Sequence, residues 1–298
     1  MKIEEHIELK KYTTFQIGGI APIVCFPESV EELLDALKKY KNALVLGNCS
    51  DVLISSQGIE EPVIITTGIK DFEIQGTKVT ATCGVKAPKL SVAVSEEGLS
   101  GFEFMIGIPG SIGGMVYMNA SAHGQSISDK FVSCIVFDRE DETVKTLTKK
   151  EMEFSYRTSI ASKKKYIILS VEFDLQKSDK EEIKNLMDRN LEFRKQKQPS
   201  LALPNAGSVF KNPENDSAGR LLEKSGVKSL IIGGAKVWEN HANFIVNIGQ
   251  ATSTDVLNLM HKMKDEVKTR YTIELVPEIK YIGNTDEEEI KIWKTIIN

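Results

Sequence analysis

The sequence predicts an α+β protein, and three observations lead to this fold class. The chain has 298 residues, enough for a large buried core and for two domains, with three smaller ones also possible. Apolar residues at helical spacing mark several helix faces, while short β-rich runs divided by glycines are typical of antiparallel strands. Neither G-x-G-x-x-G nor G-x-x-x-x-G-K-[ST] occurs, so a conventional Rossmann or P-loop fold is disfavoured.

Composition and charge narrow the class of protein. Hydrophobic residues make up 41% and charged residues 27%, a mixture typical of soluble globular proteins. The formal net charge of −4 gives no overall attraction to nucleic acid or to an anionic membrane, although local basic pockets for an anionic substrate remain open. The start resembles no signal peptide and no apolar run is as long as a membrane span, so we expect a cytoplasmic protein.

The cysteines and histidines do not suggest a metal site. The histidines show no H-x-x-x-H spacing, and no two cysteines form a C-x-x-C pair. We therefore expect no bound metal and, for the cysteines, reduced and mostly buried thiols. The cysteines are Cys25, Cys49, Cys83 and Cys134.

The N-terminal region predicts a turn, a strand and a helix in that order. The turn covers Thr13–Gly19 and leads into a strand at Ile23–Phe26. The apolar spacing over Val30–Leu37 fits one face of a helix. Ser29 is the expected N-cap of this helix, and Glu32 three residues later completes a capping box.

Two small-residue loops are candidates for binding a ligand. The loop Gly47–Asp51 follows a buried-strand candidate at Ala43–Leu46, and the backbone N–H groups of such loops can hold phosphate oxygens. The loop Gly107–Gly114 has four glycines and a proline in eight residues. Either it is a plain glycine-rich connection, or its permissive backbone is moulded onto a cofactor. The small residues of Asn119–Gly124 continue this surface.

The middle of the chain predicts a β-rich region and then a long charged helix. A first helix over 87–98 ends at a glycine, and a later one over 180–198 ends before Pro199 and links the domains. The runs from Pro62 to residue 82 are interpreted as successive antiparallel strands, and an acidic turn over 138–142 connects a hairpin. The expected strands lie at 63–67, 72–74, 78–82, 134–137, 144–147, 166–169 and 171–175.

Three basic side chains have two interpretations each. Arg194 and Lys197 lie three residues apart on one face of the linker helix. They either interact favourably with the helix dipole or form a clamp for a phosphate or carboxylate at the domain junction. Arg157 lies between Tyr156 and two hydroxyl residues, which by itself is more typical of a solvated surface residue than of a functional one.

The segment Pro204–Pro213 is bounded by two prolines that exclude a helix interior. It is either an ordinary surface turn or a shaped loop that presents Ser208, which follows a glycine. Glu278, directly after a proline, is by itself more typical of an exposed residue than of a catalytic one. The elements expected after this segment are helices at 217–223 and 254–269 and strands at 243–247 and 275–279.

These loops together resemble one family, the UDP-N-acetylenolpyruvoylglucosamine reductases, which are flavoenzymes known as MurB. Each motif alone is weak, but the set occurs in order over nearly the whole chain and is highly specific. The matching segments are Thr14–Gly19, Leu46–Leu53, Gly107–Gly114, Tyr156–Ser159, Pro204–Pro213, His241–Asn247 and Pro277–Ile279.

The resemblance implies a two-subdomain FAD-binding module of the vanillyl-alcohol-oxidase (PCMH) type, followed by an α+β substrate domain. We expect the first FAD-binding subdomain at residues 1–68 and the second at 69–183. The linker helix and the substrate domain follow at 184–298. Because the strands up to residue 175 lead directly into the linker helix, the chain resembles the shorter subtype of the family, which lacks an extra substrate-closing loop.

The resemblance also implies a reaction. The family reduces UDP-N-acetylglucosamine enolpyruvate to UDP-N-acetylmuramate in peptidoglycan precursor synthesis, with NADPH as reductant and non-covalent FAD passing hydride from N5. Arg157 matches the residue that stabilises the developing negative charge, and Ser208 matches the general acid. Glu278 matches the third family residue, which polarises the substrate carboxyl group. Because a carboxyl group beside a carboxylate favours its protonated form, we expect Glu278 to be protonated during turnover.

Binding residues are likewise implied by the resemblance. We expect contacts to the substrate or to NADPH from Tyr156, Arg194, Lys197, Asn212 and His241. The residues expected to bind FAD are Gly47, Asn48, Cys49, Ser50, Asp51, Pro109, Gly110, Ser111, Gly113, Gly114 and Asn119. The chain departs from the family pattern at Cys49, Asp51, Ser121, His123 and Trp238, which bears on affinity more than on the type of reaction.

Two other functions remain open. One is an oxidase or dehydrogenase on the same flavin scaffold, in which Ser208 and Glu278 would have no protonation task. The other is a flavin-binding or nucleotide-sugar-binding protein without turnover, which only the unusual loop 49–51 suggests. For the reductase we expect a monomer whose partners are the enolpyruvyl substrate and NADPH, with no nucleic acid or membrane.

Overall fold

The computed structural model describes residues 1–298, which divide into two compact units. The first unit comprises Met1–Glu4, Val24–Asn48 and Pro62–Arg194, and the second comprises Glu5–Ile23, Cys49–Glu61 and Lys195–Asn298. The chain therefore passes between the units several times. The division at 68/69 and 183/184 that we expect from the family resemblance stays a prediction.

A four-stranded sheet has the order β1 (Lys2–Glu8), β2 (Ile20–Phe26), β5 (Val63–Ile65) and β3 (Leu44–Leu46), and its last three strands run parallel to one another. Strand β5 lies between β2 and β3 and runs parallel to both, with β2 paired through Val24 and Cys25. Helix α1 (Val30–Lys39) connects β2 with β3, as parallel strands require a crossover. The prediction that residues 63–67 begin an antiparallel series is therefore wrong, because β-rich composition identifies a strand but not its partner.

Helix α1 begins at the predicted N-cap. Ser29 Oγ accepts a hydrogen bond from Glu32 N at 3.2 Å. The Glu32 carboxylate, however, accepts from Glu28 N at 2.9 Å, one residue before the position that a reciprocal capping box would use. The apolar face predicted for this helix is buried through Leu33 and Leu37.

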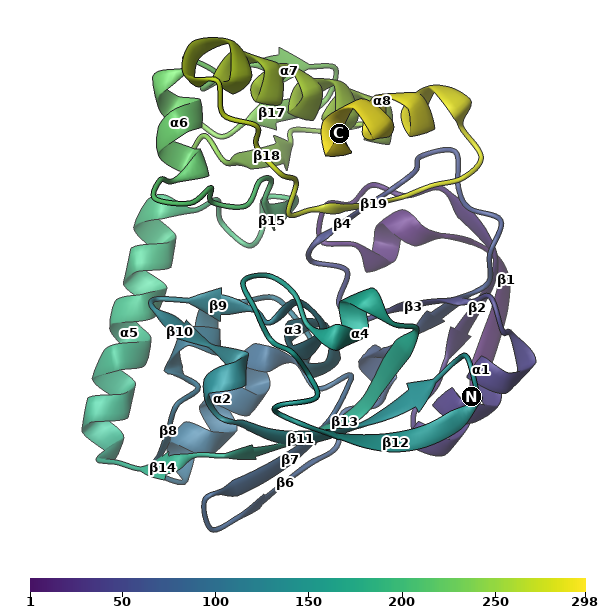
Figure 1. Ribbon diagram of the computed structural model, residues 1–298, viewed down its shortest axis with the longest axis vertical. Helices are drawn as coiled ribbons and strands as arrows, with labels where there is room; N and C mark the ends of the chain where they lie inside the picture. Colours follow the sequence, from purple (N-terminus) through teal and green to yellow (C-terminus); the bar gives the residue numbers. More distant parts are fainter. The chain divides into compact units, whose positions relative to one another are not determined.

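A five-stranded antiparallel sheet forms the larger part of the first unit (Figure 1). Its order is β12 (Thr143–Thr148), β11 (Phe131–Asp138), β13 (Tyr166–Asp174), β7 (Lys78–Thr82) and β6 (Phe72–Gln75). The hairpin of β11 and β12 is as predicted, and so is the antiparallel pairing of β6 with β7. The two strands expected over 166–175 are one continuous strand, since Ser170 between them pairs with its neighbours on both sides.

The core of the first unit lies between this sheet and short helices. Phe102 packs edge-on against Phe173, with ring centroids 5.0 Å apart. Helix α2 (Ala87–Glu96) is followed by Gly98 at φ +70°, the predicted glycine stop. Helix α3 (Ile112–Met118) begins inside the predicted loop 107–114, so that loop is shorter than expected.

One long helix and several short elements complete the first unit. Helix α5 (Lys180–Lys197) is the predicted charged helix, and the unit ends within it at Arg194. The other elements are β1 (Lys2–Glu8), which runs into the second unit, η2 (Thr66–Gly68), β8 (Leu99–Ser100), η3 (Glu103–Gly107), β9 (Ser121–Ala122), β10 (Gln125–Ser126), η4 (Ile127–Asp129), α4 (Ile160–Lys163) and β14 (Gln176–Lys177).

A four-stranded antiparallel sheet forms the centre of the second unit. Its order is β15 (Asn205–Ser208), β18 (Phe244–Asn247), β17 (Ala235–Val237) and β16 (Ile231–Ile232). Two helices, α6 (Ala218–Lys224) and α7 (Ser253–Tyr271), share a hydrophobic core with this sheet. Helix α7 begins one residue before the predicted Thr254 because Thr252 is its N-cap and forms a capping box with Asp255.

The end of the chain differs most from the prediction. The expected strand at 275–279 is wrong, because β19 covers Lys280–Ile282 and runs parallel to β4 (Val52–Ile54). Pro277 lacks an N–H group, so the residues before Lys280 form only an isolated bridge, between Pro277 and Phe210. Helix α8 (Glu287–Ile297) was not predicted, and it lies beside α7 (Figure 1). A single 3-10 turn, η1 (Leu9–Tyr12), completes the unit.

All four cysteines are free and buried, which confirms the prediction of reduced, mostly buried thiols. No group of three or more His, Cys, Asp or Glu side chains is arranged so that it could hold a metal ion. None of the helices combines the length and the apolar character needed to cross a membrane.

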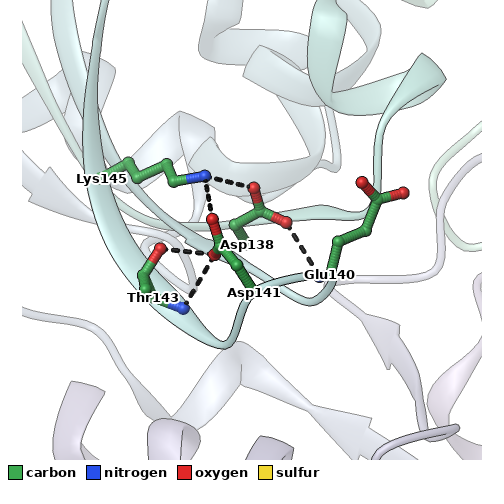
Figure 2. Close-up of polar contacts among 5 residues, drawn as sticks. All are labelled: Asp138, Glu140, Asp141, Thr143 and Lys145. Atoms are coloured by element: carbon green, nitrogen blue, oxygen red, sulfur yellow. Dashed lines mark hydrogen bonds and ion pairs between the residues drawn. The ribbon is translucent and has the colours of Figure 1, made fainter.

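The turn between β11 and β12 carries a small network of charges (Figure 2). Lys145 Nζ donates to Asp138 Oδ2 at 2.6 Å and to Asp141 Oδ2 at 2.5 Å. Glu140 N donates to Asp138 Oδ1 at 2.9 Å, and Thr143 N donates to Asp141 Oδ1 at 3.1 Å. The hydrogen bond from Lys145 lowers the pKa of both aspartates, and these two bonds raise the pKa of Lys145.

We predict that Lys145→Met lowers the melting temperature at pH 7, because it leaves Asp138, which is only 5% exposed, without its cation. An aspartate with a lowered pKa stabilises the fold fully above its unfolded value, near 3.8, and loses this contribution as the pH falls further. The difference from wild type should therefore shrink between pH 4 and pH 2.5. Thermal unfolding over this range tests the prediction, with the exposed Lys149→Met as control. A difference that stays constant with pH would contradict it.

Candidate functional site

The segment Pro204–Pro213 is a shaped loop and not a plain surface turn. Asn205 Oδ1 accepts from Gly207 N at 3.0 Å, and Asn205 Nδ2 donates to the carbonyl of Leu203 at 2.8 Å. Gly207 has φ +74°, a conformation that favours glycine. These contacts turn the chain so that Ser208, the last residue of β15, pairs with Phe244 of β18.

The backbone after Ser208 is held by one buried amide. Asn243 Oδ1 accepts from Phe210 N at 2.9 Å, and its Nδ2 donates to the carbonyl of Phe210 at 2.8 Å. Val209 N donates to the carbonyl of Asn243 at 2.9 Å. Asn243 is 3% exposed, so neither amide atom can exchange its partner for bulk water. Sequence reasoning placed Asn243 in a family motif without assigning it a role, and only its contact with residues 33 positions away shows what it does.

Glu278 lies beside Ser208 in the second unit. Its backbone N–H donates to the carbonyl of Val209 at 2.8 Å, the residue that follows Ser208. Two residues further along, Lys280 N donates to the carbonyl of Asp51 at 3.0 Å. The extended segment that contains Glu278 is thus hydrogen-bonded both to the serine loop and to the start of β4.

The predicted cofactor-loop residues Cys49, Ser50 and Asp51 also belong to the second unit. Thr14 Oγ1 donates to the carbonyl of Asn205 at 2.7 Å, and Thr14 N donates to the carbonyl of Cys49 at 3.3 Å. Thr14 therefore joins this loop to the serine loop. The sequence analysis did not assign Thr14 a role, although it opens the first motif that matches the family.

Cys49 occupies a left-handed backbone conformation with φ +48°. The side chain is 6% exposed, and burial raises the pKa of its thiol to about 12. The thiol is therefore neutral at physiological pH and a poor nucleophile. Glycine adopts positive φ at little cost, whereas a residue with a side chain is strained in this conformation.

In the first unit, the loop residues Gly47 and Asn48 lie against the second glycine-rich loop. Asn48 Nδ2 donates to the carbonyl of Pro109 at 2.6 Å. A Cβ atom at Gly47 would collide with Ser111 Oγ, and one at Gly113 would lie 2.9 Å from the Cβ of Cys83. Only residues without side chains fit this close approach, as expected where a backbone surface is shaped for a ligand.

Asn119 ends helix α3 in a left-handed conformation with φ +46°. Its Nδ2 donates to the carbonyl of Ser155 at 3.0 Å, whereas its buried Oδ1 has no hydrogen-bond partner. An unsatisfied buried acceptor is costly unless a ligand supplies the donor. The N–H edge of an isoalloxazine ring is a donor of this kind, so the residues fit the flavin that this loop is expected to bind.

Arg157 is held in place and is not a freely solvated residue. It has φ +55°, and its Nη1 donates to Ser121 Oγ at 2.6 Å while Nη2 donates to the Ser121 carbonyl at 3.4 Å. The guanidinium carbon lies 5.2 Å from the centre of the exposed Tyr156 ring. The residue-level interpretation of Arg157 as a solvated surface residue is therefore wrong, because Ser121, 36 positions away in the sequence, binds it.

The other predicted binding residues have structural partners of their own. Arg194 Nε donates to the carbonyl of Gly107 at 2.7 Å, and burial lowers the pKa of this arginine. Asn212 Oδ1 accepts from Ala218 N, the first residue of α6, at 3.0 Å. Lys197 is the last residue of α5 and belongs to the second unit.

His241 is shielded from solvent in the second unit. Burial lowers the pKa of its imidazole, which is therefore neutral at pH 7. Its Nδ1 accepts from Asn243 N at 3.3 Å, so Nε2 carries the proton. The ring packs edge-on against Phe244, with ring centroids 4.9 Å apart.

Comparison with known proteins matches two stretches of the chain to two domain families. Residues 21–148 match the FAD-binding domain family, and residues 198–282 match the C-terminal domain of UDP-N-acetylenolpyruvoylglucosamine reductase. The reductase of Bacillus velezensis is 43% identical over 289 residues, which span 95% of this chain and 94% of the relative. That of Caldicellulosiruptor bescii is 42% identical over 92% of this chain and 89% of its own length.

The chain belongs to the UDP-N-acetylenolpyruvoylglucosamine reductase family. The crystal structure of the Thermus caldophilus member, MurB, superimposes with a TM-score of 0.83 at 34% identity, covering 94% of this chain and 99% of that one. The matches confirm the α+β fold with an FAD-binding module of the PCMH type.

Two departures from the MurB pattern now have a structural explanation. Ser121 provides the hydroxyl group that binds Arg157. His123 packs edge-on against Phe193 of α5, with ring centroids 5.4 Å apart. Phe193 is 52% exposed, so the two rings form an aromatic pair at the surface of the first unit. Nothing in the structure explains Trp238, whose buried Nε1 has no partner.

We predict that Asn243→Ala lowers the free energy of unfolding by about 2 kcal/mol or more, because it leaves the N–H and C=O groups of Phe210 unpaired in the interior. Urea unfolding measures the change. Asn185→Ala, at an exposed position of α5, should change stability by less than about 0.5 kcal/mol. Equal effects of the two substitutions would mean that the amide of Asn243 does not hold the loop.

Proposed function

We propose that this chain catalyses the NADPH-dependent, FAD-mediated reduction of UDP-N-acetylglucosamine enolpyruvate to UDP-N-acetylmuramate, a step of peptidoglycan precursor synthesis. Membership of the MurB family supports the reaction, and the similarity to two family members extends over 92% to 95% of the chain. The observation that carries the assignment of residues is the hydrogen bond of 2.8 Å from Glu278 N to the carbonyl of Val209. It places the two proposed proton-handling residues, Ser208 and Glu278, on adjacent backbone segments.

The FAD-holding residues are proposed from both glycine-rich loops. Gly47 and Asn48 with Pro109–Gly114 form a surface of backbone and small side chains, which suits a pyrophosphate group without requiring a cation. The buried Oδ1 of Asn119 is suited to accept a hydrogen bond from the flavin ring. These residues would hold FAD, and the bound flavin would supply the chemistry of hydride transfer between NADPH and the enolpyruvyl double bond.

Addition of hydride at the terminal vinyl carbon leaves negative charge on the neighbouring carbon and its carboxylate. We propose that Ser208 Oγ–H donates the proton to that neighbouring carbon. A serine is a weak acid, so the step requires a very basic acceptor and a fixed geometry, which the Asn205 turn and the Asn243 clamp provide. The proposed role of Glu278 is to donate a hydrogen bond to the substrate carboxylate and so polarise it.

Arg157 is proposed to stabilise the developing negative charge. Its guanidinium is always protonated and presents donors in a planar fork that matches a carboxylate. Ser121 and Tyr156 hold it before substrate arrives, so little reorganisation is needed during the reaction.

Contacts to the substrate diphosphate-sugar or to NADPH are proposed for Tyr156, Arg194, Lys197, Asn212 and His241. The contacts already described restrict how two of them can act. The Nε–H group of Arg194 donates to the carbonyl of Gly107, so this group is not available to a ligand. His241 is neutral, so it would donate from Nε2 to a ligand oxygen without carrying a charge.

The absorption spectrum and turnover of the purified protein test the proposed function. We expect a yellow protein whose flavin is released on denaturation and which oxidises NADPH only when the enolpyruvyl substrate is present. Oxidation of NADPH without that substrate would favour an oxidase or dehydrogenase on the same scaffold. Bound flavin without any turnover would favour a binding protein.

We predict that Ser208→Ala leaves reduction of the flavin by NADPH unchanged but slows its reoxidation by substrate by about 10²- to 10⁴-fold, the usual contribution of a general acid. Stopped-flow absorbance of the flavin measures the two half-reactions separately. The control is Ser178→Ala, at an exposed position of the first unit, which should leave both half-reactions unchanged. Equal losses in both half-reactions would refute the proposed role of Ser208.

A further inference from the structure

A buried carboxylate in helix α8 has no role in the reaction described so far. Glu289 is 0% exposed and lies in the first turn of the helix. Its Oε2 accepts from Ser55 Oγ at 2.7 Å and from Tyr281 Oη at 2.8 Å. Its Oε1 accepts from Thr254 Oγ1 at 2.6 Å and from Ser253 Oγ. Four hydroxyl groups thus converge on one carboxylate, which makes no ion pair.

The burial of the Glu289 carboxylate among hydroxyl groups, without a cation, needs a physical explanation. A buried carboxylate without a cation costs several kcal/mol unless hydrogen bonds to it replace the lost water. Hydroxyl groups donating to a charged acceptor form short, strong bonds. Burial and the bond to Glu289 both raise the pKa of Tyr281, so its hydroxyl group stays protonated and remains a donor.

The four hydroxyl groups belong to three separate segments of the second unit. Ser55 directly follows β4, and its N–H donates to the carbonyl of Ile282 in β19 at 2.8 Å. Tyr281 is the central residue of β19 and pairs with Leu53 of β4. Ser253 begins α7, and its Oγ accepts from Ser56 N at 2.7 Å. Glu289 therefore connects α8 to the β4–β19 pair and to the start of α7.

The β4–β19 pair leads directly to the proposed site. Glu278 lies two residues before β19, and its N–H is bonded to Val209 beside Ser208. Lys280, the first residue of β19, donates its N–H to the carbonyl of Asp51. A displacement of β19 would therefore move the backbone of Glu278 relative to the serine loop.

Close packing around the carboxylate leaves little freedom for such a displacement. A Cβ atom at Gly283 would collide with Tyr281 Oη and lie 2.8 Å from the Cβ of Ser55. At the other end of α8, Lys264 Nζ donates to the carbonyl of Ile296 at 2.7 Å, and Lys264 is 5% exposed. A buried carboxylate, Glu289, thus fixes the N-terminal end of α8, and a buried ammonium group, that of Lys264, fixes its C-terminal end. Each charge lies at the helix end where the helix dipole favours it.

We propose that Glu289 is a positioning residue for the reductase reaction, which acts by fixing β19 and through it the side chain of Glu278. Helix α8 lies beyond residue 282, where the match to the family's C-terminal domain ends. The inference rests on the proposed role of Glu278. It assigns to the C-terminal helix a part in catalysis.

The test compares Glu289→Ala and Glu289→Gln with a matched control. Glu288→Ala removes a glutamate from the same helical turn, but at an exposed position. Glu278→Gln serves as the reference for loss of the catalytic carboxyl group. Trp293 of α8 lies 5.8 Å from Tyr281 between ring centroids, so its fluorescence in a Trp238→Phe background reports whether α8 is docked. Hydrogen exchange of the backbone amides over 278–283 reports the order of β19 without depending on activity.

We expect Glu289→Ala to increase exchange over 278–283 and to lower kcat by about 10- to 100-fold, with KM changed by less than about threefold, since a displacement of about 1 Å costs this much. Reduction of the flavin by NADPH should not change. Glu289→Gln keeps the shape, and the hydroxyl groups can rotate to meet its amide, so it should restore most of the rate. If the alanine variant does not fold, Tyr281→Phe takes its place, because it removes one of the four hydroxyl groups that donate to Glu289. Faster exchange over 278–283 with a lower kcat then supports the proposal, and wild-type exchange and rate contradict it.

Two results would overturn the inference. One is a Glu289→Ala enzyme that turns over at the wild-type rate while Glu278→Gln is slow. The other is a lower kcat without any increase in exchange over 278–283 relative to Glu288→Ala. If Glu278→Gln is itself fully active, the proposed function of Glu278 has failed. That outcome is separate, because the exchange of β19 still shows whether Glu289 orders the strand.

Discussion

The hydrogen bond from Glu278 N to the carbonyl of Val209 is the contact on which the organisation of the second unit depends. It joins residues almost 70 positions apart and brings Ser208 and Glu278 onto neighbouring backbone segments. The parallel pairing of β19 with β4 extends the same contact to the loop that begins at Cys49. One extended segment is therefore bonded both to the backbone beside Ser208, the proposed general acid, and to the proposed cofactor loop at Asp51.

Twelve non-glycine residues have a left-handed backbone conformation, and four of them are residues described above. Cys49, Asn119, His123 and Arg157 all have positive φ although none is glycine, at about 1 to 3 kcal/mol each. Such strain persists only where the surroundings hold it. For Arg157 these surroundings are the hydroxyl and carbonyl groups of Ser121, and for Asn119 the carbonyl of Ser155. These contacts therefore hold the side chains of Asn119 and Arg157 in fixed positions.

Local signals in the sequence predicted much of the fold. The N-cap at Ser29, the glycine stop at Gly98 and the apolar periodicity of α7 depend only on residues within a few positions, and the structure confirms each of them. The wrong predictions concern strand partners. Composition could not show that β5 is parallel, that β19 begins after Ile279, or that the amphipathic last residues form a helix that packs beside α7.

The sequence by itself determined the α+β class, the helix ends, the reduced cysteines and, through its ordered motifs, the family. Each of these depends on residue type and short spacing, which a linear chain displays directly. The tertiary structure alone decided that Ser121 binds Arg157, that Asn243 clamps Phe210 and that four hydroxyl groups meet Glu289. Those contacts join residues 8 to 234 positions apart. Polar side chains become specific partners only after burial has removed water as the alternative.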